Sequence, residues 1–198
     1  MDNIVADSFL IVKRVDNIAI IYFNRPPVNA LSARFRDSLY ASLAELLEDE
    51  SVSGIVCTTA GLPFSAGADI KEFSSGLKGK TFVDFYYLLA SATKPVLAAM
   101  DVYALGGGLE LAMLCHYRVA HVDTRLGQPE IKLGIIPGGT GTQSLPRLVG
   151  VSKALDMMIT GRPISANEAS DIGLIDTVTN EPLDHFGVKF LIHLLWVV

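Results

Sequence analysis

Short apolar runs recur along the chain and alternate with longer segments in which apolar residues follow helical spacing. The runs cover residues 18–23, 54–59, 96–100 and 117–122, and each is rich in residues that favour strands and cores. A strand that is apolar on both sides has to be covered on both faces, as in a parallel sheet flanked by helices. The alternation therefore predicts an α/β layer structure.

The first fifty residues predict a hairpin followed by a helix. The runs 9–12 and 18–23 flank a turn at 16–17, and prolines directly after the second run end it. Ser32 is a favoured N-cap residue, and apolar side chains recur at helical spacing over 35–47.

The rest of the chain predicts further helices between the apolar runs. No segment has the composition of a domain linker, and no repeat of fixed period is present. Helical spacing, capping residues and glycines place these helices at 81–92, 106–115, 142–149, 153–159 and 165–173.

Composition excludes several classes of protein. Half of the 198 residues are hydrophobic, which is too many for a disordered chain, and the net charge of −5 gives no basic face for nucleic acid. The apolar stretch 190–198 is far shorter than the roughly 20 residues that span a bilayer. Cys57 and Cys115 lie in apolar runs and are expected to be unpaired core thiols in a reducing compartment. We expect a soluble intracellular protein with no nucleic-acid partner and no membrane span.

Several familiar motifs are matched only in part. Gly106 begins a glycine run that lacks the third glycine of a dinucleotide fingerprint, and Pro63 replaces the first glycine of a nucleophile elbow. A serine hydrolase therefore ranks behind other interpretations, since no nucleophile–base pair is visible. The four histidines lack the spacing of zinc ligands, so no metal is expected.

Three segments place reactive groups where the backbone is unusually free. Small residues at 64–70 and a glycine run within 104–110 leave backbone N–H groups open to a ligand. Glu110 lies in the first turn of the helix that the glycines begin, and Glu130 is a lone acid in the mostly apolar segment 126–137. Such parts can polarise a carbonyl and move protons beside it.

Each of these features also has a purely structural interpretation. Glycines at a helix start can serve packing or capping, and Glu110 can simply complement the helix dipole. Glu130 can be an exposed acid in a loop. Only the joint occurrence of all of them favours a catalytic site.

The same segments resemble the enoyl-CoA hydratase/isomerase (crotonase) superfamily over nearly the whole chain. Residues 25–30 and 115–118 resemble in particular the N-terminal hydratase module of peroxisomal-type multifunctional β-oxidation enzymes. The other segments that carry the resemblance are 29–31, 66–70, 106–112, 127–130 and 134–143.

The resemblance implies a role for each motif residue. Glu110 and Glu130 fall on the two catalytic glutamate positions of the superfamily, and the N–H groups of Ala68 and Gly107 would form the oxyanion hole for the thioester oxygen. Arg25 and Lys71 are candidate phosphate contacts. The remaining substrate and coenzyme A contacts would be Ala66, Gly67, Asp69, Ile70, Ala30 and Leu31.

The resemblance also implies a fold: a crotonase-like spiral of β-β-α units with the C-terminal helical lobe truncated. Residues 1–180 would form the enoyl-CoA hydratase/isomerase domain, and 181–198 an apolar C-terminal tail. Homo-oligomers would be weakened because helices that supply subunit contacts are missing. No cofactor is expected, since coenzyme A is part of the acyl-CoA substrate.

The implied activity is hydration of 2-trans-enoyl-CoA to 3-hydroxyacyl-CoA in fatty-acid β-oxidation. Two glutamates favour a hydratase, while an isomerase needs only one base. Enoyl-CoA isomerase and a truncated, non-catalytic acyl-CoA-binding or interaction module stay open as alternatives. A peroxisomal or cytoplasmic location is expected ahead of a mitochondrial one.

The end of the chain has a helical stripe of its own. Apolar residues recur at helical spacing within 188–198, which predicts a short helix packed on the core or on another subunit. The competing interpretation is a frayed, solvated tail. The stripe consists of Phe190, Leu191, Leu194, Leu195 and Val198.

Overall fold

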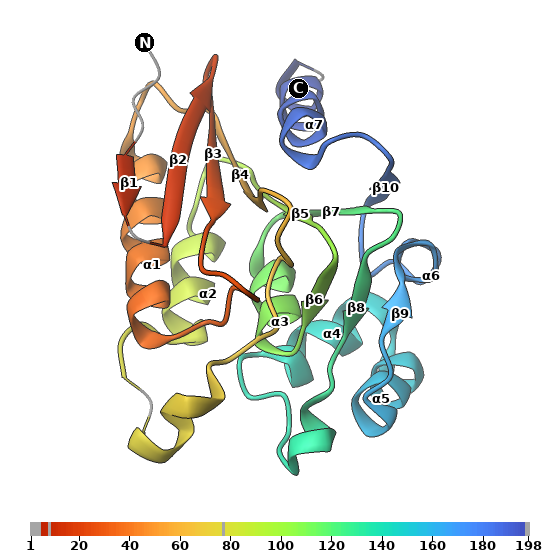
Figure 1. Cartoon of the computed structure of the whole chain (residues 1–198). Coiled ribbons are helices and arrows are strands. Elements are labelled where there is room, and N and C mark those ends of the chain that lie inside the picture. The colour runs from red at the N-terminus through yellow and green to blue at the C-terminus, as the bar shows by residue number, and fades with distance from the viewer. Residues whose placement is uncertain (1–4, 8, 77, 197–198) are drawn as a thin grey trace.

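The computed structural model describes residues 5–7, 9–76 and 78–196. The described chain forms a sheet of seven strands in the order β1-β2-β3-β4-β5-β7-β10 and a second sheet of three in the order β6-β8-β9 (Figure 1). The strands are β1 (Val5–Asp7), β2 (Leu10–Val15), β3 (Ile18–Phe23), β4 (Gly54–Thr59), β5 (Val96–Met100), β6 (Tyr103–Leu105), β7 (Tyr117–His121), β8 (Arg125–Gly127), β9 (Ile164–Ser165) and β10 (Thr177–Thr179). The predicted α/β class is confirmed.

Helices connect most of these strands, and those predicted from the sequence are present close to their expected bounds. Among the described residues no helix combines the length and the apolar character that crossing a bilayer requires. The helices are α1 (Ala33–Glu48), η1 (Ile70–Ser75), α2 (Phe82–Ala90), α3 (Gly107–Leu114), η2 (Glu130–Leu133), α4 (Gly141–Val149), α5 (Val151–Thr160), α6 (Ala166–Asp171) and α7 (Leu183–Trp196), of which η1 and η2 are 3-10 helices.

The predicted hairpin begins the large sheet. Strands β2 and β3 pair antiparallel around a turn in which Asp16 has φ +53°, a left-handed conformation that Asp tolerates. From β3 the sheet continues parallel through β4, β5, β7 and β10. Between β3 and β4 the chain crosses over through α1, whose predicted cap is present: the Ser32 hydroxyl accepts a hydrogen bond from the Phe35 N–H.

Alternate residues of β3 face two different cores. Ala19, Ile21 and Phe23 pack into the larger core, beneath α1, α2 and α3, whereas Ile18, Ile20 and Tyr22 pack into the smaller core, beneath α7. Because successive side chains of a strand point to opposite faces, a strand that is apolar at every position needs cover on both sides. Here α7 covers the second face.

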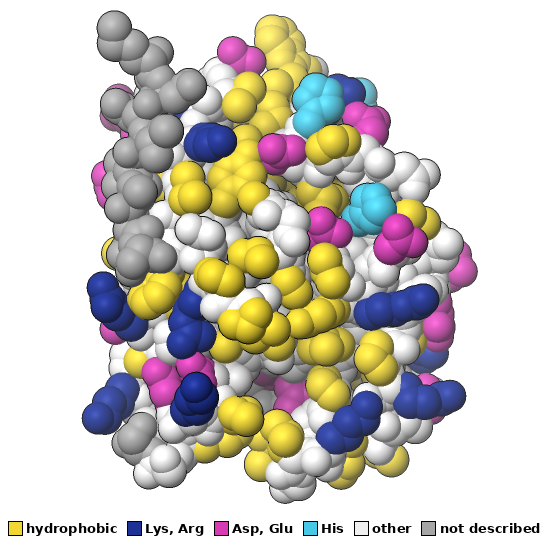
Figure 2. All heavy atoms as spheres, in the orientation of Figure 1, with side chains coloured by type: hydrophobic (Ala, Val, Ile, Leu, Met, Phe, Trp, Pro, Cys, Tyr) yellow, Lys and Arg dark blue, Asp and Glu magenta, His cyan; other side chains and the backbone are white. Residues whose placement is uncertain are grey.

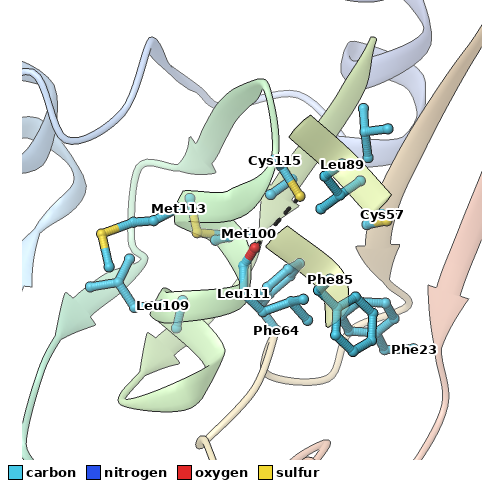
Figure 3. Close-up of a cluster of buried hydrophobic side chains, with 14 of the residues drawn as sticks. Phe23, Cys57, Phe64, Phe85, Leu89, Met100, Leu109, Leu111, Met113 and Cys115 are labelled. Atoms are coloured by element: carbon cyan, nitrogen blue, oxygen red, sulfur yellow. Dashed lines mark hydrogen bonds between the residues drawn. The ribbon is translucent and has the colours of Figure 1, made fainter. Parts of the chain in front are cut away.

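The larger core holds both cysteines as free, buried thiols, as the sequence predicts. Figure 3 shows Cys57 and Cys115 among leucine, phenylalanine and methionine side chains. Burial raises the pKa of Cys115 to about 12 and that of Cys57 well above its usual value. Both thiols therefore stay protonated at neutral pH.

The second sheet was not predicted. Its strands β6, β8 and β9 are two or three residues long, and the added edge strands β1 and β10 have three residues each. A period of two cannot be recognised over so few positions. The small sheet matters because β6 leads directly into α3, and β8 precedes Glu130 by two residues.

The predicted C-terminal helix is present but begins earlier, at Leu183, and the expected stripe is confirmed in part: Phe190 and Leu194 are partly buried against the smaller core. Leu195 is exposed and Leu191 fully buried, while Val198 lies outside the described residues. Gly187 brings the helix close to the sheet, since a Cβ there would lie 2.9 Å from a Val56 methyl carbon. The sequence stripe missed this contact because glycine carries no apolar side chain. The buried residues of α7 are Leu183, Gly187, Val188 and Leu191.

Candidate active site

A cavity of about 670 Å³ lies between η1 and α2 on one side and η2 with the following loop on the other, with the start of α3 as its floor. Both predicted glutamates and both predicted N–H donors line it, namely Glu110, Glu130, Ala68 and Gly107. The fold thus brings together groups from three separate segments. Figure 2, drawn in the orientation of Figure 1, shows hydrophobic side chains gathered over the middle of the visible face and Lys and Arg side chains along its sides.

Glu110 is fixed by two backbone donors. It lies in the first turn of α3 and is 3% exposed. Its Oε1 accepts hydrogen bonds from the N–H groups of Gly139 and Gly141, at 2.8 and 2.7 Å. Burial raises the pKa of Glu110 and these two donors oppose the shift.

Glu130 has a different environment at the start of η2. It is 8% exposed, and burial, together with the nearby charge of Glu110, raises its pKa to about 7. The side-chain amide of Gln128 faces it, and with its nitrogen on that side donates to Oε1 and Oε2 at 3.0 and 3.1 Å. The carboxyl group lies against the start of α3, where a Cβ on Gly106 would be 3.0 Å from Oε1.

The two predicted N–H donors lie side by side. A Cβ on Gly107 would be 3.4 Å from the Ala68 nitrogen, and one on Gly67 would be 3.1 Å from the Gly107 nitrogen. Gly107 is the first residue of α3, where an N–H has no intrahelical acceptor. Over the described part of the chain, neither Ala68 nor Gly107 donates its N–H to another group. The pair can therefore receive an oxygen from a ligand.

The other predicted contact residues divide between this cavity and an adjoining one of about 730 Å³. Leu31 lines neither; it is buried, and its backbone pairs with Ala68 as an isolated bridge. Gly67 lines the first cavity, Ala30 and Asp69 line the second, and Ala66 and Ile70 line both.

The adjoining cavity also contains the two candidate phosphate contacts, Arg25 and Lys71. Arg25 is already paired, since its Nη2 lies 2.8 Å from Asp69 Oδ2 and its Nη1 donates to the Ala30 carbonyl. Burial alone would raise the pKa of Asp69, but hydrogen bonds from Arg25 and the Lys71 N–H outweigh it and lower the pKa. Asp69 also caps η1, as expected of an acid in that position.

Several site residues were missed from the sequence. Gly139 and Gly141 hold Glu110, and the only sequence signal for them is the glycine-rich run after Pro137. Gln128 gave no signal of its own. The buried Arg36 lines the cavity and donates to three backbone carbonyls, which ties the segment before α2 to α1.

No group of three His, Cys, Asp or Glu side chains with metal-binding geometry occurs within residues 5–7, 9–76 and 78–196.

Comparison with known families decides the classification. The family model described as enoyl-CoA hydratase/isomerase matches residues 13–193. The chain belongs to this family. Its solved neighbours include enoyl-CoA hydratases from Thermoplasma volcanium (TM-score 0.82, 29% identity, 92% of this chain and 76% of that one) and Mycobacterium tuberculosis (TM-score 0.81, 30% identity, 92% and 80%). The crotonase-like fold is thereby confirmed.

Curated relatives are more similar in sequence. A peroxisomal bifunctional enzyme of Danio rerio is 43% identical over 180 residues, which are 91% of this chain and 25% of that protein. A probable enoyl-CoA hydratase of Bacillus subtilis is 47% identical over 166 residues, 80% of this chain and 64% of that protein. The chain thus spans about a quarter of the bifunctional enzyme and just under two thirds of the bacterial protein.

Proposed function

We propose that this chain hydrates 2-trans-enoyl-CoA to 3-hydroxyacyl-CoA, as a step of fatty-acid β-oxidation. One observation carries the proposal: Glu110 and Glu130 line the same cavity as the N–H groups of Ala68 and Gly107. Relatives named enoyl-CoA hydratase and peroxisomal bifunctional enzyme support the same reaction. Coenzyme A enters as part of the substrate, and the proposal includes no cofactor.

The two N–H groups act on the thioester carbonyl. When water adds to the third carbon of the acyl chain, the electrons of the double bond move toward the carbonyl, and negative charge grows on its oxygen. Fixed donors favour this charge more than they favour the neutral carbonyl, and losing one such donor costs roughly 10²–10³ in rate in well-studied cases. Ala68 and Gly107 supply these donors.

The two glutamates divide the proton transfers. Glu110, whose ionised form is favoured by the N–H groups of Gly139 and Gly141, takes a proton from water as the new C–O bond forms. Glu130, whose pKa of about 7 keeps much of it protonated near neutral pH, gives its proton to the second carbon. One proton is taken and one is given, so the net reaction is the addition of water; a final proton transfer restores both carboxyl groups.

The shape of the site suits an acyl-CoA molecule. The two cavities share Ala66, Ala68, Ile70 and Leu133, so a ligand that passes these residues can occupy both. The thioester would lie beside the glutamates and the polar part of coenzyme A near Lys71. Much of the remaining lining of the first cavity is apolar and suits an acyl chain; these residues include Phe73, Phe82, Val83, Ile135 and Ile136.

Enoyl-CoA isomerase is a second candidate, because Glu130 has a pKa suited to moving a proton between two carbons of the substrate. An isomerase does not need Glu110. The variant Glu110→Gln would therefore abolish hydration while leaving isomerisation of 3-enoyl-CoA in place. The third candidate, a non-catalytic acyl-CoA binder, would bind the thioester and turn over neither substrate.

A hydration assay tests the proposal. The purified chain is mixed with crotonyl-CoA, the loss of the enoyl-thioester absorbance is followed, and binding of butyryl-CoA is measured by calorimetry. Turnover that saturates with substrate supports the hydratase. Binding without turnover of 2-enoyl-CoA or 3-enoyl-CoA would leave only the acyl-CoA binder.

The proposal extends to the location and assembly of the chain. Peroxisomal and glyoxysomal relatives support a peroxisomal location, and the Bacillus subtilis relative supports a cytoplasmic one. Imaging of a fluorescent fusion distinguishes the two. Homo-oligomer formation stays a prediction, which sedimentation of the purified chain tests.

A further inference from the structure

The two N–H donors belong to different segments, so something has to fix their relative position. Ala68 follows β4 through a loop, whereas Gly107 begins α3 after β6. A carbonyl oxygen can accept hydrogen bonds from both N–H groups only if the loop and the helix start keep a fixed relative position. Two polar side chains near these segments, those of Asn29 and Ser65, are 0% exposed, and neither lines either of the two cavities described above.

Ser65 contacts the segment of Asn29, the loop that leads to Ala68 and the segment around the start of α3. Its hydroxyl donates to the Asn29 carbonyl at 2.7 Å and accepts from the Gly67 N–H at 3.0 Å. Its carbonyl accepts from the Leu105 N–H at 3.0 Å. A Cβ on Gly108 would lie 2.6 Å from the Ser65 carbonyl oxygen, so α3 packs directly on this residue.

Asn29 holds Ser65 from the other side. Its Nδ2 donates to the Pro63 carbonyl at 2.7 Å, and its Oδ1 accepts from the Arg25 N–H at 2.7 Å. Its φ of +48° lies in the left-handed region, which Asn adopts more readily than most residues. This conformation directs the Asn29 carbonyl toward the Ser65 hydroxyl.

We propose that Asn29 and Ser65 are positioning residues that set the relative position of the Ala68 and Gly107 N–H groups. Ser65 lies three residues before Ala68, and its carbonyl binds Leu105, two residues before Gly107. The Ser65 hydroxyl therefore holds the loop that carries Ala68, and the Ser65 carbonyl holds the segment that leads to Gly107. The proposal rests on the proposed function in so far as a thioester oxygen is what the donors bind.

The test compares two buried hydroxyl side chains, those of Ser65 and Thr179. Ser65→Ala removes the hydroxyl that bonds Gly67 and Asn29. Thr179→Val is the control, because Thr179 is also buried and its hydroxyl accepts a backbone N–H, that of Glu181, in β10 and away from the donor segments. Both variants lose a buried hydroxyl that bonds the backbone, so a general loss of stability would appear in both.

Two measurements separate positioning from folding. The first is the split between kcat and KM for crotonyl-CoA. For Ser65→Ala we expect kcat to fall about 10- to 100-fold with KM little changed, the result of a misplaced transition-state donor. The second is the infrared shift of the thioester C=O stretch when butyryl-CoA, labelled with ¹³C at the carbonyl, binds. We expect a smaller shift in Ser65→Ala than in the parent, and we expect Thr179→Val to match the parent in both measurements.

The outcomes are distinct. Parent values of kcat and of the carbonyl shift in folded Ser65→Ala would overturn the proposal, as would an equal loss of kcat in Thr179→Val. If Ser65→Ala does not fold, Asn29→Gly decides by the same two measurements, since glycine permits the left-handed backbone and removes both side-chain bonds. If this variant also fails to fold, the pair serves folding and the positioning role is rejected.

Failure of the proposed function gives a different pattern. A parent chain that binds butyryl-CoA but hydrates nothing would remove the hydratase, while the carbonyl shift would still test the positioning residues. A parent chain that binds no acyl-CoA would remove both.

Discussion

Glu110 and Glu130 are the same residue type on one cavity wall, but the regions that hold them differ. The Glu110 region consists of the first turn of α3 and a glycine-rich loop that donates two N–H groups to one carboxylate oxygen. The Glu130 region consists of a 3-10 helix and a single glutamine amide. Both carboxyl groups are nearly fully buried.

The difference shows how backbone placement sets the proton affinity of a side chain. Burial raises the pKa of both acids, but at Glu110 two charge-assisted hydrogen bonds oppose part of the rise. At Glu130 the neighbouring charge adds to burial and brings the pKa to about 7. A pair of acids with different proton affinities can act as base and acid in one reaction.

The largest expected effect is the loss of either carboxyl group. Glu110→Gln and Glu130→Gln should each reduce kcat for crotonyl-CoA hydration by about 10²- to 10⁴-fold, the scale of positioned acid–base catalysis. Glu48→Gln, at the exposed end of α1, is the control and should match the parent. Parent activity in either site variant would remove that glutamate from the mechanism.

The next effect comes from crowding the loop that holds Glu110. A Cβ on Gly139 would lie 2.6 Å from Glu110 Oε2, and one on Gly141 would lie 2.7 Å from Oε1. Gly139→Ala and Gly141→Ala should displace the carboxylate and reduce kcat roughly 10- to 100-fold. In the same loop, a Cβ on Gly138 would have its nearest neighbour, the Ile136 carbonyl oxygen, at 3.8 Å, so Gly138→Ala should keep parent activity. Equal activity in all three variants would show that the loop does not position Glu110.

A smaller effect is expected from the amide that contacts Glu130. Because Glu130 has to carry a proton, activity should decline as pH rises through about 7, where this acid ionises. Gln128→Leu removes the donor that favours the ionised form, so the decline should move to higher pH, by about one pH unit. The pH dependence of kcat/KM measures the shift, and Gln143→Leu, at an exposed position of α4, is the control. A decline at unchanged pH would show that Gln128 does not act on Glu130.

The smallest effect concerns stability. Between about pH 4.5 and 7 the folded chain keeps a proton on Glu130 that the unfolded chain has lost, so the free energy of unfolding falls as pH rises through this range. Glu130→Gln removes that dependence. Relative to the parent, the variant should gain on the order of 2 kcal/mol between pH 5 and pH 8, measured by urea denaturation. No relative gain would mean that the Glu130 carboxyl group keeps an ordinary pKa.

The sequence was most informative where a pattern is long or chemically unusual. Apolar runs of five or six residues predicted the central strands, Ser32 predicted the start of α1, and the glycines before Glu110 predicted an open helix start. These signals are local, so they can be recognised without the fold. The same motifs carried the resemblance that the family match confirms.

The remaining features depend on contacts between distant segments. Gly139 and Gly141 donate hydrogen bonds to Glu110, which lies about thirty residues earlier in the sequence. The Ser65 hydroxyl donates to the carbonyl of Asn29, 36 residues earlier. Nothing in the local sequence shows such pairs, and strands of two or three residues leave no period to recognise. The contact of α7 at Gly187 was missed for a related reason, since this residue approaches the sheet through the absence of a side chain.

The order in which the two glutamates lose their protons tests the account most directly. The side-chain carboxyl signals of ¹³C-labelled glutamates are followed by NMR from pH 4 to 9, with Glu110→Gln and Glu130→Gln used to assign the two resonances. We predict that the Glu110 signal reaches its ionised position first and that the Glu130 signal titrates with a midpoint near 7. The reverse order, or titration of both signals below pH 5, would contradict the assignment of Glu110 as the base and Glu130 as the acid.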